Sequence, residues 1–229
     1  MTAAPPFPSW TVVSVMERSY AMARDIFPAF VTTTLVLAVP SVIVDALGLG
    51  LLGSIVHLVC SVATSICITW GALQAMSGRK PEWEPILRQL QAPLFGRLLA
   101  LGCIQYFFIA LSAILVIPPL FLMPLWAVTI PAMMVERTDI GASFQRSVDL
   151  TRDRRLRILG TFLLWLLIFV AGGAVIVALL GHGRVAHLVL WVYAAIAATV
   201  MQPLPAIFYV LLCEEKEGAT VGQITSALD

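Results

Sequence analysis

Six long apolar runs, separated by shorter polar segments, dominate the hydropathy pattern of this chain. About 20 helical residues cross the hydrocarbon core of a bilayer, and each run approaches that length. Within lipid, backbone polar groups find no water, so a crossing segment must satisfy them internally as a helix. The pattern therefore predicts an all-α integral membrane protein of a single domain over 1–229. The six predicted transmembrane helices cover residues 27–47, 51–77, 95–117, 118–135, 158–180 and 187–212.

The segments between the runs alternate in length and in charge. On one side they are short: residues 48–50, the corner at Pro118 and Pro119, and residues 181–186. On the other side they are longer and basic, which arranges the six runs as three hairpins. Thirteen of the fourteen Lys and Arg residues lie on this side, and only Arg184 lies on the other. Short basic loops stay in the cytoplasm, so we expect a multi-pass protein of the bacterial inner membrane with both termini cytoplasmic.

Each predicted hairpin follows a short amphipathic segment, and another such segment closes the chain. We expect Ser9 or Thr11 to cap the first segment and Asp139 to cap the third. In the second, Glu84 and Arg88 stand in the favourable i, i+4 order. Segments of this kind lie in the membrane interface, so they predict a collar of helices on the cytoplasmic face. The apolar face predicted for the first segment is Val13, Met16, Tyr20, Ala23 and Phe27.

Two of these amphipathic segments share a motif. Arg18-Ser19 is followed by Arg24-Asp25, and Arg146-Ser147 is followed by Arg152-Asp153 at the same spacing. The pattern RSxxxxRD indicates duplicated hairpin units, with a chance repeat as the alternative.

The densest positive charge lies in and just after the second copy of the motif. A basic residue near an anionic membrane surface gains about 1 kcal/mol. We therefore expect this cluster to face anionic lipid headgroups or a partner protein, the alternative being that it only orients the fifth span. The cluster comprises Arg146, Arg152, Arg154, Arg155 and Arg157.

Few polar residues lie within the predicted spans. Asp45 lies near the end of the first, His57 about two turns into the second, and Gln105 and Gln202 well inside theirs. Ionisable residues in a span are candidates for function, and broken helices beside an amide can form a midplane substrate site. The alternatives are that Asp45 lies at the outer interface and that His57 bonds to a neighbouring helix. For Gln105 and Gln202, the alternative is that the nearby kinks only shape the bundle. The prolines expected to interrupt spans are Pro40, Pro131, Pro203 and Pro205.

No catalytic or metal-binding motif is found in the sequence. It has no GxSxG, HExxH or P-loop pattern and no Cys/His cluster with metal spacing, so we expect no enzyme, no cofactor and no metal. A net charge of +1 gives no indication of nucleic-acid binding. The four cysteines, which we expect to be free thiols, are Cys60, Cys67, Cys103 and Cys213.

The stretch from Pro131 to Leu164 has an ordered series of features. An apolar helix ends in an acidic–basic pair, followed by Gly and a small residue, Arg-Ser, an apolar–Thr pair and a basic run. This stretch resembles the YciC-like family of bacterial inner-membrane proteins. It is also similar to the membrane domain attached to some glycerophosphodiester phosphodiesterases. The resemblance implies a six-helix membrane module. Phosphodiesterase activity does not carry over, because no residues here correspond to that catalytic site.

Two main functional hypotheses follow from these patterns. The first is a non-enzymatic inner-membrane module that organises or binds lipid, a partner membrane protein or a second copy through its amphipathic collar. The alternative is a small transporter or channel that uses Asp45, His57, Gln105 and Gln202 near the proline-kinked helices. A membrane-embedded enzyme of lipid metabolism is a weaker third hypothesis, because few polar groups converge.

Overall fold

A computed structural model gives the fold of the chain and describes residues 10–226 apart from 81, 92, 114–116 and 182. Within these residues the regular structure is helical, without strands. The helices are α1 (Val12–Asp25), α2 (Phe27–Ala46), α3 (Gly50–Met76), α4 (Trp83–Arg88), the 3₁₀ turn η1 (Gln89–Gln91), α5 (Phe95–Ala113), α6 (Ile117–Leu125), α7 (Thr129–Glu136), α8 (Ile140–Thr151), α9 (Arg155–Leu180), α10 (Arg184–Met201), α11 (Leu204–Glu217) and α12 (Val221–Ser226).

Several helical segments are suited to a membrane. Among the described residues, five segments are long and apolar enough to cross one, and a further apolar segment, Leu120–Glu136, is shorter. The predicted all-helical architecture with several long apolar helices is confirmed. The five segments are Phe27–Val44, Gly50–Met76, Phe95–Ser112, Arg155–Leu180 and Val192–Glu217.

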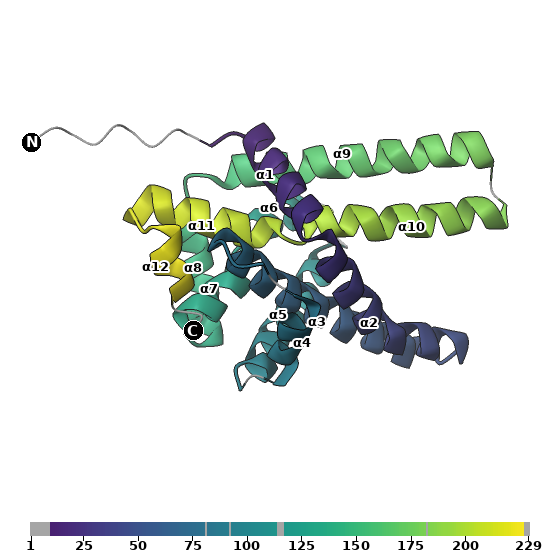
Figure 1. Cartoon of the computed structure of the whole chain (residues 1–229), viewed down its shortest axis with the longest axis horizontal. Helices are drawn as coiled ribbons and strands as arrows, with labels where there is room; N and C mark the ends of the chain where they lie inside the picture. The colour runs from purple at the N-terminus through teal and green to yellow at the C-terminus, as the bar shows by residue number, and fades with distance from the viewer. Residues whose placement is uncertain (1–9, 81, 92, 114–116, 182, 227–229) are drawn as a thin grey trace, which may run out of the picture.

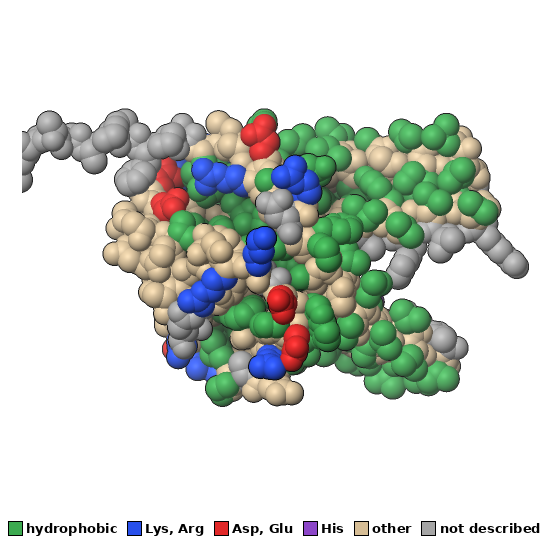
Figure 2. Space-filling view, viewed as in Figure 1, with side chains coloured by type: hydrophobic (Ala, Val, Ile, Leu, Met, Phe, Trp, Pro, Cys, Tyr) green, Lys and Arg blue, Asp and Glu red, His purple; other side chains and the backbone are tan. Residues whose placement is uncertain are grey.

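The molecule has two chemically different ends. In Figure 1 the hairpins α2–α3 and α9–α10 project to the right, while α8, α11 and α12 gather on the left. Figure 2 shows basic and acidic side chains on the left half, whereas the coloured side chains of the projecting hairpins are apolar. Leu51 is 79% exposed and Leu179 is 77% exposed, which suits contact with lipid. We call the left half the charged end and the projecting half the apolar end.

The three hairpins close into a ring. α3 contacts α5, α6 contacts α9, and α10 contacts α2, so each hairpin packs against the next. Inside the charged end, α3, α7 and α11 contact one another and form the core. Residues 206–213 of α11 are all buried, as expected for a helix that is apolar on every side and surrounded by others.

The fourth and sixth predicted spans are each divided into two helices, at the prolines expected to interrupt them. Residues 126–128 separate α6 from α7, and residues 202–203 separate α10 from α11. Proline explains both divisions, because it lacks an N–H for the carbonyl four residues earlier and is tolerated in a first turn. Pro131 lies in the first turn of α7, and Pro205 in that of α11. Pro40, in contrast, lies inside α2 without interrupting it.

Side chains satisfy the carbonyls released between α6 and α7. Ser147 of α8 donates its hydroxyl to Leu125 O at 2.8 Å. Gln105 of α5 donates through Nε2 to Trp126 O at 3.0 Å, a carbonyl that Thr129 also approaches. At the break these carbonyls have no N–H partner four residues later in the helix, and the side-chain donors take its place. In an apolar environment each backbone carbonyl needs such a donor.

The break between α10 and α11 is satisfied in the same way. Ser19 of α1 donates its hydroxyl to Val200 O, near the end of α10. Ser19 and Ser147 are both fully buried, and they are the serines of the two RSxxxxRD copies. The repeated motif thus has a repeated structural role, which is to place a hydroxyl against a broken helix of the ring.

The amphipathic helices begin largely as predicted, but α1 buries a different face. Thr11 caps α1 in a capping box with Ser14, Asp139 caps α8, and Arg88 pairs with Glu84 at 2.7 Å. Val13 and Tyr20, of the apolar face predicted to lie in the membrane interface, are 58% and 63% exposed, so other helices do not cover them. α1 runs across α9, α10 and α11, and it packs there through a different stripe (Figure 1). The buried stripe is Val15, Ser19 and Ala23.

We predict that Ser147→Ala and Ser19→Ala each destabilise the protein by about 1–3 kcal/mol, because each leaves a buried carbonyl without a donor. Equilibrium unfolding in a mild detergent measures the loss. Ser54→Ala is the control, since Ser54 is exposed and bonds weakly within its own helix at 3.5 Å. Equal stability of the three variants would contradict the capping role.

Candidate functional site

Arg146, the first arginine of the predicted lipid-facing cluster, bonds within the protein. Its Nε lies 2.7 Å from Glu136 Oε1 and its Nη2 lies 2.6 Å from Glu217 Oε1. Tyr209 donates its hydroxyl to the same Glu136 oxygen at 3.0 Å. Burial by itself lowers the pKa of the Arg146 guanidinium, but its bonds to Glu136 and Glu217 raise that pKa above the ordinary value. Arg146 therefore joins α8 to the ends of α7 and α11.

A second network joins the start of α9 to the end of α11 and to Trp10, two residues before α1. Arg154 Nε donates to the two carboxylate oxygens of Glu215 at 2.9 and 3.0 Å, and this bonding raises the pKa of Arg154. Trp10 Nε1 donates to Glu215 Oε2 at 3.1 Å. Arg157 donates to Trp10 O at 3.2 Å and lies 5.8 Å from the centre of its ring, within cation–π range.

The remaining cluster residues differ in exposure. Arg155 donates to Val148 O at 3.2 Å, and its Nε is buried without a partner among the described residues. Arg152 is exposed, and no hydrogen bond or ion pair joins it to another described residue. Nearby, Lys216 lies 3.0 Å from Asp153, and this hydrogen bond lowers the pKa of the Asp153 carboxyl. Four of the five arginines thus hold helices together, and the lipid-facing role of the cluster stays a prediction.

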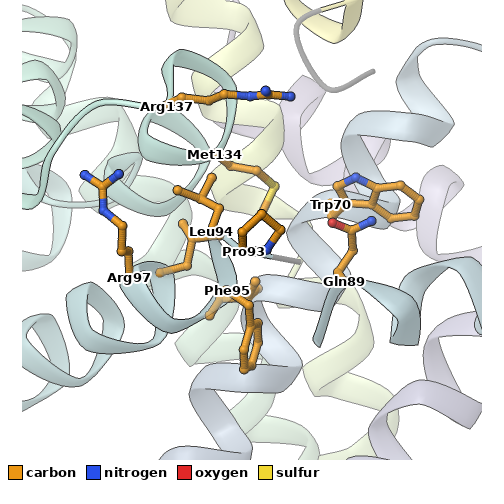
Figure 3. A pocket seen from close by; sticks show the side chains of 10 residues that line it. Trp70, Gln89, Pro93, Leu94, Phe95, Arg97, Met134 and Arg137 are labelled. Atoms are coloured by element: carbon orange, nitrogen blue, oxygen red, sulfur yellow. The ribbon is translucent and has the colours of Figure 1, made fainter. Parts of the chain in front are cut away.

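A cavity of about 440 Å³ at the charged end, which we call the arginine cavity, lies between α3, α5 and α7. Figure 3 shows Arg97 and Arg137 beside Leu94, Pro93 and Met134, with Trp70 and Gln89 on another side. No acidic residue is among the described residues that line it. The lining residues are Ile66, Trp70, Gln89, Pro93, Leu94, Phe95, Arg97, Leu98, Met134 and Arg137.

The local structure holds both arginines at the cavity. Arg97 lies in the first turn of α5 and donates through Nη2 to Thr138 O at 3.1 Å, which uses one of its five N–H donors. Arg137 ends α7 in the left-handed conformation, with φ of 52°. A guanidinium binds phosphate or carboxylate oxygens in a bidentate fork, and the apolar lining suits a hydrocarbon chain. The lining of the cavity thus combines guanidinium donors with apolar side chains.

Sequence reasoning did not single out the arginine cavity. Arg97 and Arg137 lie 40 positions apart and were only two of the basic residues assigned to one side of the membrane. Trp70, near the end of a predicted span, is the one local signal, because tryptophan is enriched where a helix meets the membrane surface. Only the packing of α3, α5 and α7 brings the three side chains to one cavity.

A second cavity, of about 500 Å³, lies between the hairpins α2–α3 and α9–α10, and we call it the polar cavity. It brings together His57 and Gln202, two of the four residues predicted for transport. Gln105 does not line it and instead bonds at the α6–α7 break. Asp45 belongs to α2, but its side chain lies outside the described residues.

Neither cavity has the donors of a metal centre. No group of three His, Cys, Asp or Glu side chains able to hold a metal ion occurs among the residues that the structure describes. All four cysteines are free.

We predict that Arg146→Met destabilises the protein by about 1–3 kcal/mol, because two partly buried carboxylates lose their common partner. Arg88→Met is the matched control, since the Arg88–Glu84 pair is 72% and 57% exposed and exposed helix pairs contribute about 0.3–0.5 kcal/mol. Unfolding measured for both variants in the same detergent tests this difference. Similar values for the two would show that the Arg146 network adds little.

Comparison of the chain with known protein families, with curated proteins and with solved structures finds no match. The resemblance to the YciC-like family and to the phosphodiesterase-attached membrane domain therefore stays a prediction.

Proposed function

We propose that this chain is a non-enzymatic protein of the bacterial inner membrane that binds anionic lipid at its cytoplasmic face. The observation that carries the proposal is the arginine cavity, where Arg97 and Arg137 flank an apolar recess without a lining carboxylate. A lipid phosphate would bond to the guanidinium groups, and an acyl chain would contact Leu98 and Met134. Arg97 bonds to Thr138 O through one of its five N–H donors, and no acidic residue is among the described residues that line the cavity.

The proposed topology has six crossings with both termini in the cytoplasm. α6 and α7 together form the fourth crossing, which is the shortest. α10 and α11 together form the sixth crossing. The basic residues support this orientation, because short segments rich in Lys and Arg remain cytoplasmic. In this orientation the arginine cavity lies at the cytoplasmic leaflet, where anionic lipids give the surface its negative potential.

The amphipathic helices support the same position. Val13 and Tyr20 of α1, Trp83 of α4 and Leu156 at the start of α9 are exposed apolar side chains at the charged end. An amphipathic helix in the interface buries such side chains among the headgroups and upper acyl chains. The collar would thus hold the arginine cavity level with the lipid headgroups.

We predict that Arg97→Gln combined with Arg137→Gln reduces retention of phosphatidylglycerol about tenfold, the effect of losing roughly 1.4 kcal/mol of binding. Native mass spectrometry of protein released from nanodiscs of phosphatidylglycerol and phosphatidylcholine measures the bound lipid. Arg152→Gln removes an exposed cluster arginine as the control, and its retention should change little. Loss of lipid in the control but not in the double variant would assign binding to the cluster. Thermal unfolding of each variant checks that the fold is intact.

We also predict opposite accessibility of two introduced cysteines in a background whose native cysteines are replaced. Leu49→Cys, in the turn between α2 and α3, should react in intact cells with an impermeant maleimide. Arg152→Cys should react only after the membrane is permeabilised. The reverse pattern would show that the protein has the opposite orientation in the membrane. It would not bear on whether the arginine cavity binds lipid.

A further inference from the structure

The polar cavity has two unlike walls. α2 and α3 supply hydroxyl groups and the imidazole of His57, whereas α9 supplies the aromatic side chains Phe162, Trp165 and Phe169. The broken joint between α10 and α11 contributes Gln202 at the edge where these walls meet. The volume of the polar cavity, about 500 Å³, is within the usual range for a small-molecule site.

Two oxygens of the lining residues are buried without a hydrogen-bond partner. They are Thr34 Oγ1, on the hydroxyl wall, and Gln202 Oε1, at the helix break. A buried amide oxygen is normally paired, and an unpaired one at a cavity calls for a donor from a bound molecule or from water.

Two hydroxyls of the hydroxyl wall already use their hydrogens within their own helices. Thr64 donates its hydroxyl hydrogen to Cys60 O and Ser41 donates to Ala38 O, each at 2.8 Å. Their oxygens remain available as acceptors, beside the acceptor of Gln202. The complementary molecule therefore carries hydrogen-bond donors, as hydroxyl or amide groups do.

The side chains of the aromatic wall belong to a stack of parallel rings. Trp165 and Phe169 stack with ring centres 5.1 Å apart and planes 8° apart, and Phe169 stacks on Tyr193 at 5.4 Å and 11°. Tyr193 fixes the stack, because its hydroxyl lies 3.0 Å from Phe169 O, and Gly172 leaves room for it. A Cβ at Gly172 would lie 2.3 Å from that hydroxyl.

The described lining residues include no Asp, Glu, Lys or Arg. A charged ligand would therefore lose its hydration without gaining a partner of opposite charge, which is costly in a site of low polarity. A neutral molecule with donors along one edge and one flat apolar face matches both walls.

We propose that the polar cavity is a hydrated binding site for a small neutral polyol, such as a cyclic sugar or cyclitol. Its hydroxyls would bond to Gln202 and to the α2–α3 wall, and its C–H face would lie against Trp165. This site is separate from the arginine cavity, so either proposal can fail without the other.

Cys60 provides a native probe of hydration, because it lines the polar cavity. The wild-type protein in liposomes is treated with a permanently charged methanethiosulfonate, and peptide mapping by mass spectrometry locates the label. Cys67 on the same helix is the internal control, since it is fully buried. We expect Cys60 to react many-fold faster than Cys67. Equally slow reaction of both cysteines would show a closed or dry cavity and overturn the proposal.

Ligand protection then tests the chemical class. We expect myo-inositol or glucose at high millimolar concentration to slow the labelling of Cys60 several-fold, with choline chloride ineffective at the same concentration. Gln202→Leu and Thr34→Val should each reduce the protection while Cys60 still reacts, and Gln89→Leu, in the arginine cavity, should leave it unchanged. Protection by choline alone would indicate a cation site, and protection by none of them would reject the polyol; either result overturns the proposal.

Discussion

The fold depends on satisfying backbone carbonyls where two helices break in an apolar environment. At such a break carbonyls lose their helical N–H partners, and side chains from other helices supply the donors instead. Ser147 and Gln105 supply donors between α6 and α7, and Ser19 supplies one between α10 and α11. Because these donors come from α1, α5 and α8, the breaks also fix how the hairpins pack. The inner halves, α7 and α11, are thereby free to turn inward and pack against α3 as the core.

The charged end shows how the same residue type serves two purposes. Arg146 and Arg154 bond to glutamates at the ends of α7 and α11, so their charge is largely used within the protein. Arg97 and Arg137 instead flank an apolar cavity whose described lining contains no carboxylate. Positive charge in a sequence therefore does not identify a lipid site by density alone. Arginines of a dense cluster can be used within the protein, as Arg146 is by Glu136 and Glu217.

The ring of hairpins also explains why two dissimilar cavities coexist. The arginine cavity lies where α5 and α7 meet α3 at the charged end, and it combines guanidinium groups with apolar side chains. The polar cavity lies between the two projecting hairpins and combines hydroxyl, amide and aromatic groups. Each forms where neighbouring hairpins leave space, so the chemistry of each follows from the helix faces that happen to meet there.

The sequence by itself determined the features that depend on local pattern. Hydropathy located α2, α3, α5 and α9, and cap residues such as Thr11 and Asp139 marked two amphipathic helices. Proline placed the breaks before α7 and α11, because a missing N–H acts within four residues. Only the tertiary structure decided that Gln105 bonds at a break, that Gln202 joins His57 at a cavity, and that Arg97 meets Arg137. These pairings join residues far apart in the chain, and hydropathy reports how apolar a helix is without reporting which helix packs against it.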